Sequence, residues 1–154
     1  MFNQTCEYAI RAAIEIARRP KTEFVLAKEL AEDLGLPHHY LSKILQQLVR
    51  SRVLESTRGR LGGFKLLRDP DQVKLVEIVA PFDDLKKKDE CILGQAVCSD
   101  ARACPLHEFW SDARARYLGE LDQKTLGDFA RFEDAREKKE SLEKKPRRGA
   151  KTRA

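Results

Sequence analysis

AKELAEDLGLPHHYLSKI, residues 27–44, is the stretch that decides the fold of this chain. Ala31 is small enough to stand where two helices cross closely, and Gly35 follows four residues later, where the backbone must turn. The apolar residues that would then pack the second helix into a core are Leu36, Leu41 and Ile44. This spacing predicts a helix-turn-helix. An ordinary helical hairpin is the alternative, because alanine and glycine also fall at these positions by chance.

The segments on either side extend this pair into a larger arrangement. Residues 5–19 repeat apolar side chains at helical spacing, with Thr5 as the expected N-cap and Pro20 as the stop. Residues 53–68 predict two short strands around the glycine-rich loop RGRLGG. Residues 73–82 favour a short helix. Three helices followed by a hairpin predict a winged helix-turn-helix.

The outward face of the second helix of the pair has the chemistry of a DNA-reading surface. Opposite its apolar stripe, helical geometry places only hydrogen-bonding and cationic residues: His39, Ser42, Lys43, Gln46 and Arg50. A merely solvated face is the alternative, but such a face usually mixes both signs of charge. A helix in a major groove needs donors for base edges and cations for flanking phosphates. We expect the first three residues to contact bases, Arg50 to contact a phosphate, and Gln46 to do either.

The hairpin loop offers a second contact with DNA. Arg58 and Arg60 stand in the loop directly after the expected recognition helix, where a wing reaches the backbone or a narrow minor groove. A functionless surface loop is the alternative. Residues 36–68 hold seven basic residues and a single acidic one, Glu55, which favours the DNA-binding interpretation.

The C-terminal part predicts a long helix, a short helix and a tail. Residues 107–123 read as a helix, and its stripe comprises Leu106, Trp110, Ala113, Tyr117 and Leu121. This stripe is expected to form a dimer interface, with packing inside one chain as the alternative. Residues 125–132 predict a short helix capped by Thr125. Residues 133–154 are basic and poor in apolar side chains, so they are expected to be disordered, or helical in their first turns at most.

Three cysteines and a histidine gather in the connector before the long helix. Cys91, Cys98 and Cys104 are separated by six and five residues, and His107 follows two residues later. Small buried apolar residues are one interpretation, although the surrounding segment is mostly polar. A structural zinc site is a second, although such sites usually use tight pairs of cysteines. Wider spacing suits an iron–sulfur cluster better, and a weaker, titratable fourth ligand suits a sensor.

The composition restricts the remaining classes of function. No apolar run approaches the roughly 18 residues of a membrane span, and the N-terminus lacks the pattern of a signal peptide. We therefore expect a cytoplasmic protein with reduced thiols. A thiol-based redox regulator or enzyme is disfavoured, because there is no Cys-x-x-Cys motif and no convincing nucleophile–base pair. No enzymatic activity is expected.

From about Cys6 to Phe129, the chain resembles the family of winged-helix repressors that includes the cluster-biogenesis regulator IscR and the nitric-oxide-sensing repressor NsrR. The resemblance is carried by EYAIRAAIEIA, the helix pair, RGRLGGFKLLRDP, the three cysteines and CPLHEFW. It implies a homodimer joined by the long helix, with a cluster near the DNA-binding domain. The first cysteine gap is one residue longer than is common in the cluster-biogenesis branch, and the outward recognition residues differ from that branch. Cys6 is extra, with core packing as its expected role and a ligand role beside Glu7 as the alternative.

The resemblance also implies a ligand set. Cys91, Cys98 and Cys104 match the family's cluster cysteines, and His107 matches the histidine that completes a [2Fe–2S] site. Glu7 matches an acidic ligand that a partner subunit contributes to a [4Fe–4S] cluster in the other branch. The [2Fe–2S] cluster with His107 is favoured, because CPLHEFW keeps both the histidine and the following tryptophan.

These observations predict a mainly α fold with a small β-hairpin wing, that is, a winged helix-turn-helix domain plus a long C-terminal dimerisation helix. The expected parts are the winged domain over 1–80, the cluster-binding connector over 81–105, the dimerisation helix and short following helix over 106–132, and the tail over 133–154. The expected function is a homodimeric repressor that binds a pseudo-palindromic operator and is controlled by an iron–sulfur cluster that senses redox state, nitric oxide or cluster status. A zinc-stabilised winged module that binds a protein partner is the alternative from another class.

Overall fold

The computed structural model describes residues 2–85, 91–94 and 98–143. In chain order its elements are α1 (Gln4–Arg18), α2 (Ala27–Leu34), α3 (His38–Arg50), β1 (Leu54–Thr57), β2 (Gly63–Leu66), the 3-10 turn η1 (Pro70–Gln72), α4 (Leu75–Val79), the 3-10 turn η3 (Asp100–Arg102), α5 (His107–Gln123) and α6 (Leu126–Glu143). The predicted fold class, mainly helical with a small antiparallel hairpin, is confirmed.

The N-cap of helix α1 stands two residues before the expected one. The side chain of Asn3 accepts a hydrogen bond from the amide of Cys6 at 2.9 Å, so Asn3 is the N-cap and the expectation of Thr5 was wrong. The hydroxyl of Thr5 instead forms a 2.5 Å hydrogen bond with the hydroxyl of Tyr40. The helix ends at Arg18, just before Pro20, as predicted.

The turn between α2 and α3 depends on Gly35. Its φ of 65° lies in the left-handed region, which a side chain disfavours and glycine adopts freely. The amide of Leu36 then donates to the carbonyl of Ala31 at 2.9 Å and closes the turn. Ala31, Leu41 and Ile44 are buried, so the predicted helix-turn-helix is confirmed at its crossing point.

The hairpin is anchored at its base to the segment before α2. Its register runs from Leu54 opposite Leu66 to Thr57 opposite Gly63. Val25 and Phe64 exchange two backbone hydrogen bonds of 2.9 Å, which fixes the hairpin against the body. A Cβ at position 63 would lie 2.4 Å from the carbonyl oxygen of Val25, so glycine is required there by close packing within the chain.

The core lies between α1, α3, α4 and the base of the hairpin, and C-terminal residues complete it. Leu121 of α5 and Leu126 of α6 are buried in the same cluster as the side chains of α1 and α3. Tyr117 packs against this cluster, and its ring lies 6.0 Å from that of Phe2. The inner end of the α5 stripe therefore packs within one chain, which corrects the expectation that the whole stripe serves a dimer interface.

Helix α6 starts at the predicted cap but is much longer than predicted. Thr125 and Asp128 form a reciprocal cap: the amide of Thr125 donates to the carboxylate of Asp128 at 2.9 Å, and the amide of Asp128 donates to the hydroxyl of Thr125 at 3.3 Å. The helix continues to Glu143, so residues 133–143 are helical, which agrees with the alternative that the first turns of the tail form a helix. Residues 144–154 lie outside the described part of the chain.

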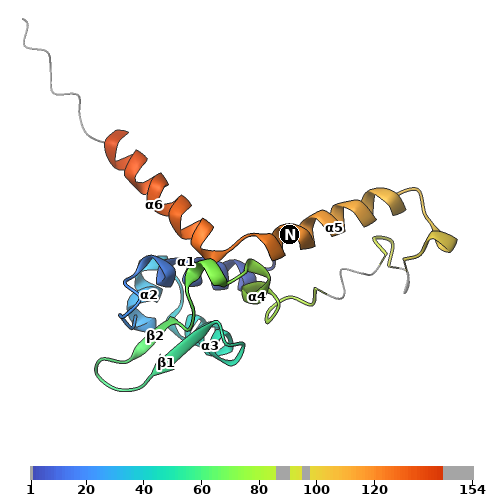
Figure 1. Cartoon of the computed structure of the whole chain (residues 1–154). Coiled ribbons are helices and arrows are strands. Elements are labelled where there is room, and N and C mark those ends of the chain that lie inside the picture. Colours follow the sequence, from blue (N-terminus) through green and yellow to red (C-terminus); the bar gives the residue numbers. More distant parts are fainter. Residues whose placement is uncertain (1, 86–90, 95–97, 144–154) are drawn as a thin grey trace, which may run out of the picture.

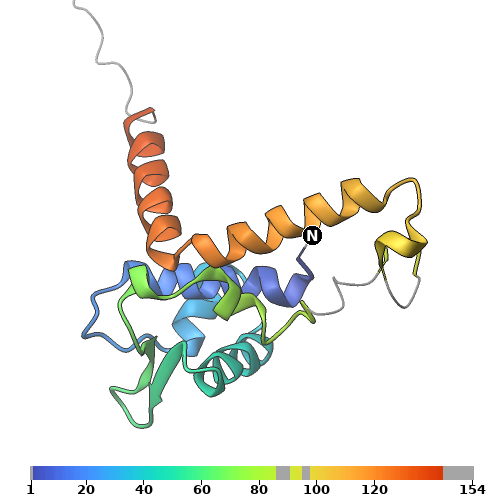
Figure 2. The same cartoon turned by 45° about the vertical axis from the view of Figure 1, so that its right-hand side comes forward.

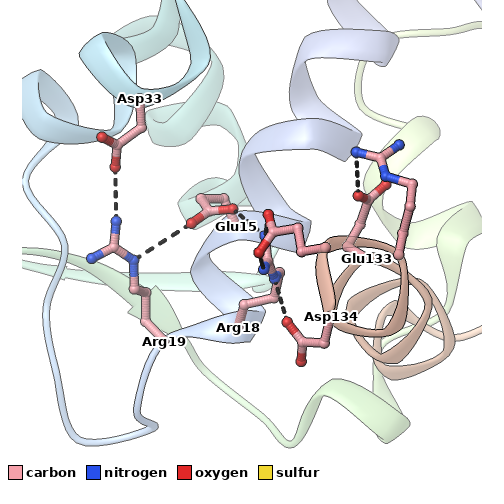
Figure 3. A network of polar contacts seen from close by, with 8 residues as sticks. Glu15, Arg18, Arg19, Asp33, Glu133 and Asp134 are labelled. Carbon is pink, nitrogen blue, oxygen red and sulfur yellow. Dashed lines mark hydrogen bonds and ion pairs between the residues drawn. The ribbon is translucent and has the colours of Figure 1, made fainter. Parts of the chain in front are cut away.

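Ion pairs explain why the charged second half of α6 is helical. Arg18 of α1 donates to Asp134 at 2.6 Å and to Glu137 at 2.5 Å (Figure 3). Hydrogen bonds from Arg18 lower the pKa of Glu137, and those to Glu137 and Asp134 raise the pKa of Arg18. Arg136 adds a pair with Glu133, three residues before it on the same helix. This network fastens α6 to the C-terminal end of α1 despite the scarcity of apolar side chains.

The arrangement separates two ends of the molecule. The hairpin and α3 lie on one side of the body, while α5 leaves α1 and extends away from it (Figures 1 and 2). The turn η3, which carries part of the cysteine connector, lies at the outer end of α5, away from the hairpin of the same chain in both views. Among the described residues, no helix combines the length and apolar character needed to span a membrane.

Candidate DNA interface and cysteine connector

The outward face of α3 is polar and accessible. Leu41, Ile44, Leu45 and Leu48 are buried, and on the opposite side His39, Lys43, Gln46 and Arg50 are exposed. Ser42 is half-buried, and its hydroxyl lies 3.5 Å from Nε2 of His38. The structure therefore brings together the five residues that the sequence selected on this helix, at the surface beside the hairpin (Figure 1).

A groove of about 460 Å³ joins this helix to the hairpin. Gln46 and Arg50 line it from α3, and Ser56, Thr57 and Arg58 line it from the hairpin. Cations and hydroxyl groups are common partners of phosphate oxygens, so the groove has the chemistry to hold one DNA strand between the two reading elements. Ser56 and Thr57 were not among the residues predicted from the sequence. Two hydroxyl side chains directly before Arg58 are the pattern from which they could have been predicted.

The electrostatics of this surface favour an anion. Glu55, the single acid among residues 36–68, forms a 3.1 Å ion pair with Lys65 across the hairpin. The negative charge of Glu55 is thus compensated by Lys65, and it reduces the positive potential of the nearby arginines only slightly. Arg58 and Arg60 are both exposed in the hairpin loop. Arg50 on α3 and the two arginines of the hairpin loop are thus exposed cations on neighbouring elements.

The cysteine connector places one sulfur beside the candidate histidine. The Sγ atom of Cys98 lies 3.2 Å from Nδ1 of His107. Burial raises the pKa of the Cys98 thiol, and the nearby thiols of Cys91 and Cys104 raise it further. Cys91 is buried, whereas Cys98 and Cys104 are half-buried. The three sulfurs and the imidazole therefore share one neighbourhood.

The imidazole of His107 is oriented by a residue that the sequence analysis missed. Its Nε2 atom lies 3.0 Å from Oδ1 of Asp100, and only 12% of the side chain is exposed. A carboxylate on one ring nitrogen leaves the other nitrogen aimed at a ligand position, an arrangement typical of metal-binding histidines. The acid seven residues before the histidine was visible in the sequence, but its role depends on the turn at η3.

Three thiols and an imidazole are a donor set that both iron–sulfur clusters and zinc ions use. Across the described residues, no group of three or more His, Cys, Asp or Glu side chains is arranged around one metal ion. A cluster distributes its ligands over several irons, so its donors stand farther apart, and thiols with an imidazole are its usual ligands. Glu7, the alternative ligand, is exposed on α1. Cys6 is buried, with its Sγ 3.8 Å from the carbonyl oxygen of Val79, as expected for a packing role.

Comparison with known proteins points to one family. The sequence model described as "Rrf2: Iron-dependent Transcriptional regulator" matches residues 2–131. An rrf2-like HTH-type transcriptional regulator of Rhodobacter capsulatus is 32% identical over 136 residues, which cover 83% of this chain and 91% of that protein. The HTH-type transcriptional regulator NsrR of Shouchella clausii is 28% identical over 129 residues, covering 83% and 87% of the two chains.

Solved structures share the fold. CymR, the global cysteine regulator of B. subtilis, superposes with a TM-score of 0.72 at 23% identity, covering 86% of this chain and 97% of that one. T. potens IscR superposes with a TM-score of 0.68 at 22% identity, covering 90% of each chain. At these identities the likeness concerns the arrangement of the helices and the hairpin.

Proposed function

The chain belongs to the Rrf2 family of DNA-binding transcriptional regulators, and from that premise we propose that it is a homodimeric repressor controlled by an iron–sulfur cluster. The family's members are regulators and not enzymes. The proposed division is a winged reading domain over 1–80 and a cluster-binding connector over 81–105. The observation that carries the proposal is the contact between Cys98 and His107, in one connector with two further cysteines.

The cluster would be held by the thiolates of Cys91, Cys98 and Cys104 and by Nδ1 of His107. A cluster bound there supplies a site that oxidants or nitric oxide attack most readily at its weakest ligand. Asp100 holds the imidazole in orientation through Nε2. The [2Fe–2S] form is favoured because His107 already faces Cys98. Glu7 of a partner subunit, as fourth ligand of a [4Fe–4S] cluster, is the alternative.

DNA binding would use both walls of the groove between α3 and the hairpin. Helix α3 would enter a major groove with His39, Ser42 and Lys43 toward base edges, and Gln46 toward a base or a phosphate. Arg50, Arg58 and Arg60 would bind phosphates or the adjacent minor groove. The exposure of all but Ser42 supports these roles.

The outer half of α5 supports a dimer. Phe109 is 67% exposed and Leu106 is 44% exposed, although the inner end of the same helix is buried. Large apolar side chains on a helix that leaves its own domain are typical of an interface. Two chains paired through α5 would present two α3 helices to a pseudo-palindromic operator, with half-sites separated by about 34 Å.

A short chain of contacts connects the start of the connector with α3. The side chain of Asn3 donates to the carbonyl oxygen of Phe82 at 2.9 Å, and Thr5, on the first turn of α1, bonds to Tyr40 of α3. A shift of the connector would therefore change the position of the start of the recognition helix. By linkage, DNA would change the affinity for the cluster by the same factor as the cluster changes the affinity for DNA.

The test is anaerobic purification followed by iron and sulfide analysis, an absorption spectrum and duplex binding by the loaded and the stripped protein. We expect about equal iron and sulfide, visible absorption, and different DNA affinities in the two states. Cys98→Ala should abolish the iron and the difference. A colourless protein whose DNA binding ignores Cys98→Ala would overturn the sensing function.

The same measurements separate the alternatives. Zinc without sulfide, together with no affinity for duplex DNA, would indicate the protein-binding module. DNA binding that responds to thiol oxidation in a protein without iron would indicate a thiol regulator.

A further inference from the structure

We propose that Leu61, at the tip of the hairpin, is a wedge that enters the DNA minor groove and selects a deformable base step. This proposal rests on the proposed function, because it needs the wing to lie on DNA. It adds a specificity-determining residue that is neither a cation nor a hydrogen-bond donor.

The backbone of the loop holds Leu61 outward. The amide of Gly62 donates to the carbonyl oxygen of Gly59 at 3.0 Å and closes a tight turn around Arg60 and Leu61. Gly62 is buried, and a Cβ there would lie 2.4 Å from the carbonyl oxygen of Thr57. With the base fixed to Val25, the turn has little room to fold Leu61 back onto the body. The turn projects beyond α3 (Figures 1 and 2).

The exposure of Leu61 is unusual for its surroundings. It is 90% exposed, the highest value among the large apolar side chains of the described residues. A single exposed leucine needs no explanation on an ordinary surface. Here, however, it directly follows Arg60 and precedes Gly62 in the hairpin loop, which in the proposed function lies on the DNA. The other large apolar side chains exposed above 50% are on the connector, α5 and α6.

An exposed apolar side chain can insert between base pairs from the minor groove. Leucine is one of the apolar residues that architectural proteins insert between base pairs, where it partly unstacks a step and kinks the duplex. Pyrimidine–purine steps resist this least, so a wedge prefers them without any hydrogen bond to a base. Arg58 and Arg60 would hold the flanking phosphates and keep the wedge in register.

The experiment uses the full chain, purified anaerobically, and duplexes enriched by the wild-type protein from a random library. The fluorescent base 2-aminopurine is placed in turn at each step beside the recognition-helix site. Its emission rises when stacking is lost. The variants are Leu61→Ala and, as a matched control, Leu142→Ala, an equally simple truncation at a 63% exposed leucine on α6. Thermal unfolding of both variants verifies that the fold is retained.

We expect wild type and Leu142→Ala to raise the emission at one step beside the helix site. Leu61→Ala should lose that rise and bind about tenfold more weakly, while its preferences at the helix site stay unchanged. No rise with wild type at any step, or equal affinity and equal emission for Leu61→Ala, would overturn the wedge and leave the regulator intact. Failure of the wild-type protein to enrich any duplex would instead overturn the proposed function, and the wedge with it.

Discussion

Nδ1 of His107 lies 3.2 Å from Sγ of Cys98, while the other ring nitrogen lies 3.0 Å from Asp100. The ring is therefore held between a carboxylate and a thiol. A ligand that is already oriented loses less freedom on binding, so the orienting carboxylate should matter almost as much as the ligand.

Asp100→Asn should weaken iron retention about tenfold or more, because the amide supports the imidazole less well than a carboxylate. Competition with a chelator, followed at the absorption band of the loaded protein, measures the change. Asp112→Asn, an exposed change on α5, is the control. Equal retention in the two variants would mean that Asp100 does not support a ligand.

Arg18→Met should destabilise the chain by about 1 kcal/mol, since exposed ion pairs contribute little singly but Arg18 joins several carboxylates. Urea unfolding in low salt measures this loss, and added salt should reduce it. Arg136→Met removes the same charge but only pairs within α6, so its loss should be smaller. Comparable losses of stability in the two variants would show that the ion pairs between α1 and α6 add no more stability than the pairs within α6.

Acid should loosen α6. Hydrogen bonds from Thr125 lower the pKa of Asp128 below its ordinary 3.8, and Arg18 lowers that of Glu137 below its ordinary 4.5. A carboxyl with a lowered pKa stabilises the fold above its unfolded value, and this contribution disappears as the pH falls through the folded value. Stability should thus start to fall near pH 4.5 and continue below 3.8.

The double variant Asp128→Asn, Glu137→Gln should flatten this acid limb in unfolding experiments performed at successive pH values. Glu108→Gln, on the exposed surface of α5, should leave the limb as in the wild type. An unchanged limb in the double variant would locate the acid sensitivity in other carboxyls.

Phosphate contacts and base contacts should differ in how strongly the DNA affinity that they provide depends on salt concentration. Arg58→Ala should reduce the slope of log affinity against log salt by about 1 and weaken binding to all sequences alike. Ser42→Ala should keep the slope and relax the preference at one base pair, by about 1–3 kcal/mol. Filter binding on enriched and scrambled duplexes distinguishes them. A slope change in Ser42→Ala, or a sequence-selective loss in Arg58→Ala, would reverse the assignment.

Cys6→Ala should leave the iron content unchanged, because Cys6 is buried in the core and points to Val79. It should cost about 1 kcal/mol of stability through lost packing. Iron analysis beside Cys98→Ala is the measurement, and loss of iron in Cys6→Ala would make Cys6 a ligand.

Local patterns were sufficient for much of the fold. Ala31, Gly35 and Leu41 encode the helix crossing in residues close in sequence, and the hairpin is encoded by its glycines. The cap of α1 could not be predicted in this way. Asn3 and Thr5 are both good caps, and the bond from Thr5 to Tyr40, 35 residues away, removes Thr5 from the competition.

The length of α6 and the contact of Asp100 with His107 could not be predicted from the sequence for the same reason. Glu137 pairs with Arg18 across 119 residues, so a charged segment that looks like a free tail is held as a helix. The candidate ligands were found because their chemistry is rare. Asp100 was not, since an acid in a polar connector is common until the turn brings it to His107.

The contacts of Asn3 with Phe82 and of Thr5 with Tyr40 are made by neutral groups. Dissolved ions screen charges, so they hardly affect hydrogen bonds between neutral groups. They weaken the ion pairs between Arg18 and α6, and they weaken contacts of arginines with phosphates. Raising the ionic strength should therefore weaken the attachment of α6 and the binding of nucleic acid, while the bonds that join Asn3 to Phe82 and Thr5 to Tyr40 persist.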